Sequence, residues 1–261
     1  MKNFKSEFKG LDKLGINEAF LKACSQGNLA DVKFLLDSSE LEFNADIDYK
    51  AGLGFKSACN NNNIDIVKHL SSSKHIENLN THMGFLGACG KGHIEIVKYL
   101  LTSKDVACPP DIARNNYHSF RWTCFHGHVD IAQFLLTSPE LLTHANIHIQ
   151  SDEPFVMACR SGNHQMVKYL LTGEDLKEHS YVHAQGDKGF KEACDQGHIN
   201  TINYLICDFK IILTEAIKEH LEENNFLQIE NMFRYRELNQ NLIEDLNNDK
   251  IMNKNRKKIK L

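Results

Sequence analysis

Apolar residues recur along the chain in a two-part pattern that is typical of a helical hairpin. Within residues 83–101 they occur first at i, i+3 and i+4 and then, after Gly92, at i, i+3, i+6 and i+7, and each spacing places them on one face of a helix. The first set is Phe85, Ala88 and Cys89, and the second is Ile94, Val97, Leu100 and Leu101. Gly92 suits the end of the first helix, because glycine adopts the left-handed conformation of a helix C-cap at little cost. The pattern predicts a unit of helix, tight turn and helix.

This unit occurs six times. Its cysteine follows the preceding one by 35, 30, 35, 35 and 35 residues, at Cys24, Cys59, Cys89, Cys124, Cys159 and Cys194. Every unit has a phenylalanine four positions before the cysteine, and the turn position three after it is occupied by Gly27, Asn62, Gly92, Gly127, Gly162 and Gly197. Self-similarity at this period predicts a stack of units that stabilise one another, rather than one globular core. The shorter interval falls in a connector, so the helices keep their register.

A polar residue follows each turn. The residues at this position are Asn28, Asn63, His93, His128, Asn163 and His198. We expect them at the start of the second helix, where Asn can cap free amide groups. Turn-forming clusters at 46–48, 115–116, 151–152 and 186–187 lie in the connectors that precede the phenylalanines.

The unit also has a family resemblance. Residues 88–101 read Ala-Cys-Gly-Lys-Gly-His-Ile-Glu-Ile-Val-Lys-Tyr-Leu-Leu, and on this motif and its copies the chain resembles an ankyrin-repeat protein over about residues 15–207. The resemblance implies antiparallel helix pairs stacked side by side, with connectors turned out as fingers and a concave binding face. The family's Thr-Pro-Leu-His opening is absent apart from Pro154. The inter-repeat hydrogen bonds of its His are then missing, so we expect modest stability.

The expected fold is an all-α, ankyrin-type helix-turn-helix solenoid with four parts. Residues 1–14 form an N-terminal segment, and residues 15–207 form the array of six repeats. Apolar residues of the unit's skeleton return without the Ala-Cys signature after it, so residues 208–249 are interpreted as a degenerate seventh repeat followed by a capping helix. The apolar positions assigned to that capping helix are Leu238, Leu242, Ile243 and Leu246. Residues 250–261 are Asn- and Lys-rich, which predicts a basic disordered tail.

Composition narrows the class of protein. The chain has 30 basic and 34 acidic residues and a net charge of −4, so it has no global electrostatic footprint for nucleic acid. It has no amino-terminal apolar leader and no apolar stretch long enough to insert into a membrane. Eight cysteines without a secretory signal predict reduced thiols. We therefore expect a soluble, cytoplasmic protein and a monomer, with self-association through poorly capped ends as an alternative.

Candidate chemistry is weak. Cys89 and His93 are four residues apart, as in metal sites, but the turn glycine places them on different elements, and the same holds for the two similar pairs. The column cysteines lie on the packing face, which argues against a nucleophilic thiol. Phosphate-binding and dinucleotide-binding glycine motifs are absent from the sequence. The sequence predicts no enzyme, no cofactor, no metal and no small-molecule substrate.

The expected partner is a protein of unknown identity, bound on the concave face by a non-enzymatic scaffold. The two residues after each column cysteine point toward that face by resemblance, and Phe125 breaks its polar rule. Aromatic residues and Arg are the usual anchors of protein interfaces. The predicted partner-binding residues are Tyr117, Trp122, Phe125, His126, Arg160, Lys91, Asp195 and Gln196.

An alternative is a host-directed effector of an intracellular microbe or virus, delivered into a host cell and carrying a functional C-terminal segment. This alternative rests on the Asn-, Lys- and Ile-rich character of the repeats and is an analogy. The basic tail also suggests nuclear import, although Lys-rich termini are usually only solvated.

Overall fold

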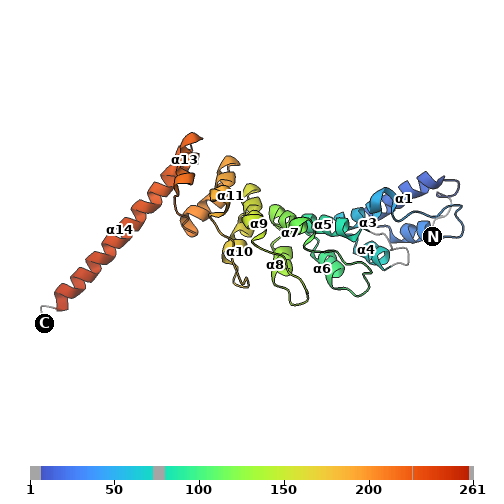
Figure 1. Ribbon diagram of the computed structural model, residues 1–261, viewed down its shortest axis with the longest axis horizontal. Helices are drawn as coiled ribbons and strands as arrows, with labels where there is room; N and C mark the ends of the chain where they lie inside the picture. The colour runs from blue at the N-terminus through green and yellow to red at the C-terminus, as the bar shows by residue number, and fades with distance from the viewer. Residues whose placement is uncertain (1–6, 73–79, 225, 259–261) are drawn as a thin grey trace.

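The computed structural model describes residues 7–72, 80–224 and 226–258, with side chains for all of these except 242 and 244–258. Each unit contributes one inner and one outer helix to a single row (Figure 1). The inner helices are α1 (Lys13–Gln26), α3 (Tyr49–Asn60), α5 (Thr81–Lys91), α7 (Arg114–His126), α9 (Ile149–Arg160) and α11 (Ala184–Asp195). The outer helices are α2 (Leu29–Asp37), α4 (Ile64–Ser71), α6 (Ile94–Thr102), α8 (Val129–Thr137), α10 (His164–Thr172) and α12 (Ile199–Asn203), which continues as the π-helical turn η2 (Tyr204–Asp208). The described residues contain no strand, and the predicted all-α solenoid is confirmed.

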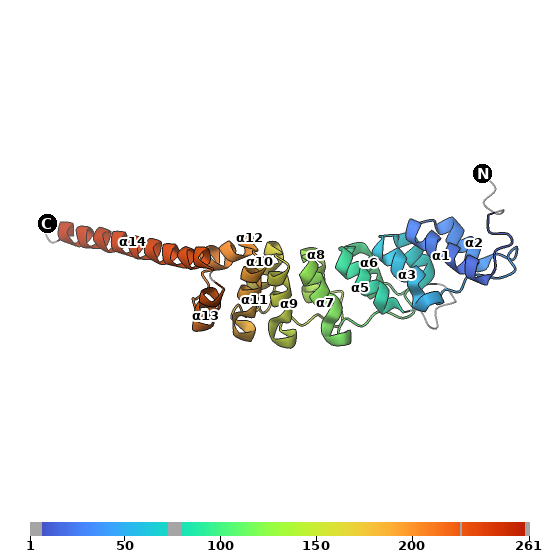
Figure 2. The ribbon, with the colours of Figure 1, turned by 90° about the horizontal axis from the view of Figure 1, so that it is seen from above.

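The row is built by contacts between neighbours. Each inner helix packs against the next one, from α1 to α11, and each outer helix packs against its own inner helix. The inner helices follow the upper side of the row in Figure 1, and the row bends toward this side. Helices α13 (Glu215–Glu223) and α14 (Leu227–Lys258) follow the last unit, and α14 leads away from the array (Figure 2). The array therefore presents one long surface formed by its inner helices.

The turn between the two helices of each unit is left-handed, as predicted. The five turn glycines have φ between 69° and 78°, and the exception, Asn62, has φ 59°. Asn is one of the few other residues that occupy this region readily. Four of the five glycines have a second role, because the next unit lies against them: a Cβ on Gly92 would lie 2.6 Å from the ring of His128. Both the left-handed backbone conformation and the close approach of the next unit therefore favour glycine at this position.

The polar residue after each turn ties its unit to the preceding one. Its side chain hydrogen-bonds to a backbone carbonyl near the end of the preceding inner helix, and the pairs, side chain first, are Asn63 with Cys24, His93 with Asn60, His128 with Gly90, Asn163 with Phe125, and His198 with Arg160. We call these five side chains the ladder. Only Asn28, at the first unit, caps its own helix, by accepting from the amide of Asp31 at 3.2 Å.

The ladder corrects two expectations. The capping role predicted for Asn63 and Asn163 is wrong, because neither side chain makes a cap bond. Both amides donate instead to the preceding unit, where the carbonyls at a helix end lack partners within their own helix. The ladder also supplies hydrogen bonds between units, so the reason for expecting modest stability no longer holds.

A second set of ties comes from left-handed segments of three residues at the starts of four inner helices. These segments are residues 50–52, 115–117, 150–152 and 185–187, with φ between 52° and 75°. The last residues of the third and fourth segments are Asp152 and Asp187, and both carboxylates are buried. Asp152 accepts from the amide of Tyr181 at 3.1 Å, and Asp187 accepts from the hydroxyl of Thr214 at 2.6 Å. Each carboxylate therefore holds the element that follows it in the row.

The core follows the predicted columns. All six column phenylalanines are fully buried, and the position before each one holds a small residue or Pro154. Space explains this preference, since a Cβ on Gly54 would lie 2.6 Å from the ring of Phe20 in the preceding unit. The six column cysteines are separate, buried free thiols, as predicted. Burial raises the pKa of Cys24 and Cys194 to about 12 and raises the pKa of the other four thiols further, so none is poised as a thiolate.

The C-terminal end differs from the predicted cap and tail. One continuous helix, α14, occupies residues 227–258, whereas the sequence predicted a separate capping helix and a disordered tail from residue 250. Ile229 and Phe233 are buried against the array, and the ring of Phe233 lies 5.8 Å from that of Phe190. Farther along, Leu238 and Ile243 are 66% and 58% exposed, so they do not cover the preceding repeat. Leu242 and Leu246 lie outside the described side chains, and the proposed division of the chain into four parts remains a prediction.

Candidate partner-binding surface

The exposed surface of the inner helices, here called the inner face, carries most of the predicted binding residues. In each unit the two residues after the cysteine lie at the end of the inner helix, where the left-handed turn stops it. Most of these residues are exposed or half-buried, as their polar character requires. Gly90 is the exception, because it is buried beneath Trp122 of the next unit.

Aromatic side chains gather on the inner face of α7. The ring of Trp122 stacks on that of Phe125, with centroids 5.4 Å apart and an interplanar angle of 11°. His126 lies edge-on to Trp122 at 4.8 Å, and His118 lies edge-on to it at 6.1 Å. We call these four residues the aromatic cluster. They occupy positions i, i+4, i+7 and i+8, which lie on one face of the helix over about two turns, so one helix can bring them together.

Trp122 is the centre of the cluster, and its ring packs on α5 of the preceding unit. A Cβ on Gly90 would overlap the indole ring, so the ring lies directly on the backbone of α5. Trp122 nevertheless remains 37% exposed. A tryptophan that is fixed in place and still accessible has little side-chain entropy to lose when a partner covers it.

The surroundings of His126 favour its neutral form. Burial, the neighbouring His128 and the nearby ammonium of Lys91 all lower the pKa of His126. At neutral pH the imidazole therefore acts as a flat aromatic surface with a polar edge, and Lys91 is the charged group beside it. The predicted residues Lys91, Trp122, Phe125 and His126 thus form one neighbourhood.

The other four predicted residues lie outside this neighbourhood. Tyr117 is the last residue of a left-handed segment, with φ 54°, and packs half-buried against the core. Asp195 binds Nε2 of His220 at 2.8 Å, which joins α11 to α13, and Gln196 is exposed at the end of α11. Neither of them belongs to the aromatic cluster as defined by its ring contacts.

Arg160 forms an ion pair within the protein. Its guanidinium donates two hydrogen bonds to the carboxylate of Glu192 in the next unit, at 3.0 and 2.6 Å. These bonds lower the pKa of Glu192, although burial opposes the effect. A bidentate pair of this kind fixes both side chains. Arg160 therefore ties α9 to α11, and its charge is already neutralised on the inner face.

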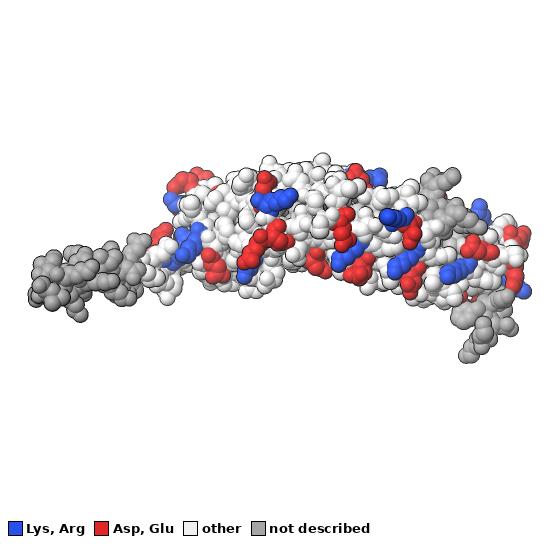
Figure 3. Space-filling view, turned by 90° about the horizontal axis from the view of Figure 1, so that it is seen from below, with Lys and Arg blue, Asp and Glu red and all other residues white. Residues whose placement is uncertain are grey.

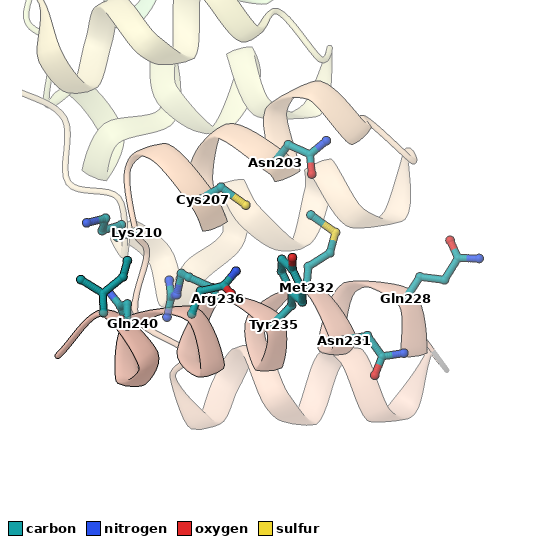
Figure 4. Close-up of a pocket in the computed structure, with 11 residues that line it drawn as sticks. Asn203, Cys207, Lys210, Gln228, Asn231, Met232, Tyr235, Arg236 and Gln240 are labelled. Atoms are coloured by element: carbon teal, nitrogen blue, oxygen red, sulfur yellow. The ribbon is translucent and has the colours of Figure 1, made fainter. Parts of the chain in front are cut away.

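A groove at the C-terminal end was missed by the sequence analysis. It has a volume of about 690 Å³ and lies between α14 and the segment formed by α12 and η2 (Figure 4). Cys207 lines one side, and Met232, Tyr235 and Ile243 line the other. Arg236 donates to the carbonyls of Ile206 and Ile211, at 3.1 and 2.7 Å, and so anchors α14 beside η2.

The signal for this groove was present in the sequence. Its α14 residues recur from 228 to 243 at helical spacing, on one face of the helix. Of these residues, Ile243 was assigned to a capping helix, because the sequence does not show where the helix leaves the array.

Comparison with known proteins supports the repeat assignment. Residues 55–143 match a family model described as ankyrin repeats, with three copies. This stretch runs from the phenylalanine of the second unit to the connector after the fourth, and it contains the whole aromatic cluster. No curated protein matches the chain. None of the described helices has the length and apolar character needed to cross a membrane.

Proposed function

We propose that this chain, which carries ankyrin repeats, is a non-enzymatic scaffold that binds a protein partner on its inner face, with the aromatic cluster of α7 as the anchor. Ankyrin repeats indicate a protein–protein interaction domain, and the family is generally non-enzymatic. The concave position of the contact and the identity of the anchor are our proposal.

The observation that carries this proposal is the open stack of Trp122 on Phe125. Polar residues are the rule at the ends of the inner helices, and this unit replaces them with aromatic side chains in the middle of the row. Core packing does not require this exposure, since the column phenylalanine of the same unit, Phe120, already fills the core. Exposed aromatic residues at the centre of a surface are the usual energetic anchors of protein interfaces.

The test is a Trp122→Ala substitution. Loss of a central aromatic anchor costs about 2 kcal/mol or more, which corresponds to about a 30-fold increase in Kd. Partners captured from cell extract with the intact chain would be identified and purified, and their Kd for each variant would be measured by isothermal titration calorimetry. Leu142→Ala is the matched control, because Leu142 is a fully exposed apolar residue in a connector.

Two results would contradict the proposal. One is a partner that binds the Trp122→Ala variant as tightly as it binds the unchanged chain. The other is that no protein is captured by both the intact chain and the Leu142→Ala control. Helical circular dichroism of each variant shows whether the fold is intact.

A host-directed role remains the alternative, with the C-terminal segment acting on its own. The groove between η2 and α14, and the exposed Tyr235 beside it, are the observations that favour a contact there. The cell compartment and delivery into a host remain predictions from the sequence.

A further inference from the structure

In the helices of the central repeats, acidic residues are confined to the outer layer. The inner helices α3, α5 and α7 contain no Asp or Glu, and their basic residues are Lys50, Lys56, Lys91, Arg114 and Arg121. The corresponding outer helices α4, α6 and α8 each carry a carboxylate in the first turn, at Asp65, Glu95 and Asp130. Figure 3 shows the side of the row on which the outer helices lie, and residues of both charges alternate along it. The net charge of −4 therefore hides a basic stretch on the inner face.

Several of the central cations are unneutralised. Within the described residues, Lys56, Lys91 and Arg114 have no carboxylate partner within ion-pair distance. Lys50 is different, because it binds Glu18 at 2.7 Å. Burial lowers the pKa of both His126 and His82, and the charges of Lys91 and Arg114 respectively lower it further. At His82 the carboxylate of Asp111 opposes the effect of Arg114.

The carboxylates on the flanking inner helices each contact a basic side chain, which is Lys or Arg for Glu18, Glu153 and Glu192 and His for the other three. Their partners, carboxylate first, are Glu18 with Lys50, Asp152 with His148, Glu153 with Lys188, Asp187 with His183, Glu192 with Arg160, and Asp195 with His220. In the connector before α7, one carboxylate oxygen of Asp111 accepts a hydrogen bond from the amide of Ala113 at 2.9 Å. Cations without a carboxylate partner also occur among the described residues of the flanking inner helices, at Lys13, Lys22 and Lys191. The middle of the inner face, beside the aromatic cluster, is thus distinguished by cations in a stretch of inner helices that contains no carboxylate.

We propose that the partner presents an acidic segment to this surface, with carboxylates at Lys56, Lys91 and Arg114 and one apolar or aromatic side chain on the Trp122–Phe125 stack. This inference rests on the proposed function and specifies its partner. Opposite charges around a desolvated anchor speed the encounter and fix the register of the bound segment. The partner's carboxylates meet no free carboxylate on α3, α5 or α7, so little repulsion opposes binding there.

The same surface suits a protein segment better than a nucleic acid. A nucleic-acid strand needs a continuous run of cations along its phosphates. Here α1, α9 and α11 place carboxylates at both ends of the basic stretch, and uncharged residues such as Gly87 and Asn60 separate its cations. An acidic peptide can place its carboxylates at the spacing of these separated cations.

The test uses three fluorescein-labelled probes and fluorescence anisotropy. The first is a 12-residue peptide of Glu with a central Leu-Phe, the second has Gln in place of every Glu, and the third is a 12-nucleotide oligothymidylate. The variant is Lys56→Glu/Lys91→Glu, and its control is Lys68→Glu/Lys98→Glu, which makes the same change in net charge on the exposed outer helices. Each titration is run at 50 mM and 300 mM NaCl.

The acidic peptide should bind more tightly than the other two probes. Its Kd should rise by about tenfold in the inner-face variant and at the higher salt concentration, and it should change little in the outer-face control. Equal binding of the Gln peptide, an equal loss in both variants, tighter binding of the oligothymidylate, or no binding of the acidic peptide would overturn the inference. The proposed function would survive these results if Trp122→Ala still weakened the captured partner, so the two failures are distinguishable.

Discussion

At the scale of single residues, the turn position meets two requirements in four of the six units. The turn residue must adopt a left-handed conformation, and at Gly27, Gly92, Gly127 and Gly162 it must also leave room for the ladder residue of the next unit. The first requirement could be predicted from the sequence, because only Gly and Asn occur there. The ladder could not be predicted, since Asn at the start of a helix is equally suited to capping, and only the position of the neighbouring unit decides between the two.

The ladder makes a prediction about stability. His128→Ala removes the bond to the carbonyl of Gly90, and loss of such a hydrogen bond costs about 1 kcal/mol. The midpoint of urea unfolding, followed by circular dichroism, should fall. His128→Asn should retain most of the stability, because Asn fills the same position in other units.

The matched control for this substitution is His179→Ala. Nε2 of His179 bonds to the carbonyl of Gly173 within the same connector, so its loss should affect stability less. If His128→Ala and His179→Ala lower the midpoint equally, the ladder does not join the units as we describe.

At the scale of helices, the sequence predicted the hairpins but not their connections. The column of buried phenylalanines and the amphipathic outer helices follow directly from apolar spacing. The left-handed segments had only turn-forming residues to mark them, and the segment at 50–52 follows the predicted turn rather than coinciding with it. The role of Arg160 was missed for a similar reason, because its partner Glu192 lies in the next unit.

Helix α14 provides a test at this scale. Its buried residues Ile229 and Phe233 lie near its start, whereas Leu238 and Ile243 are exposed. A chain that stops after Gln240 should therefore keep the unfolding midpoint of the full chain. A chain that stops after Glu223 should unfold at lower urea, since it uncovers Phe190 and removes the ties of Arg236.

The alternative account predicts a loss of stability in both shortened chains. If the distal part of α14 covered the last repeat as a cap, the chain ending at Gln240 would already lose stability. Circular dichroism during urea unfolding, with the full chain as reference, separates the two accounts.

At the scale of the whole molecule, stacking of the repeated helix pairs produces one continuous inner face. Changes at the ends of the inner helices leave the buried columns untouched, so the face can vary while the fold is kept. The aromatic cluster could be predicted because Phe125 breaks the polar rule of its position. Its assembly with His118 and its support on Gly90 required the three-dimensional arrangement.

The most direct test of the account needs no substitution, because Trp122 is the single tryptophan of the chain and lies at the proposed contact. Its fluorescence would be recorded during titration with the captured partner, or with a fragment of that partner that lacks tryptophan. Binding at the aromatic cluster should shift the emission to shorter wavelength and reduce quenching by acrylamide, since the indole loses contact with water. Unchanged emission and unchanged quenching at saturating partner would place the contact elsewhere on the molecule.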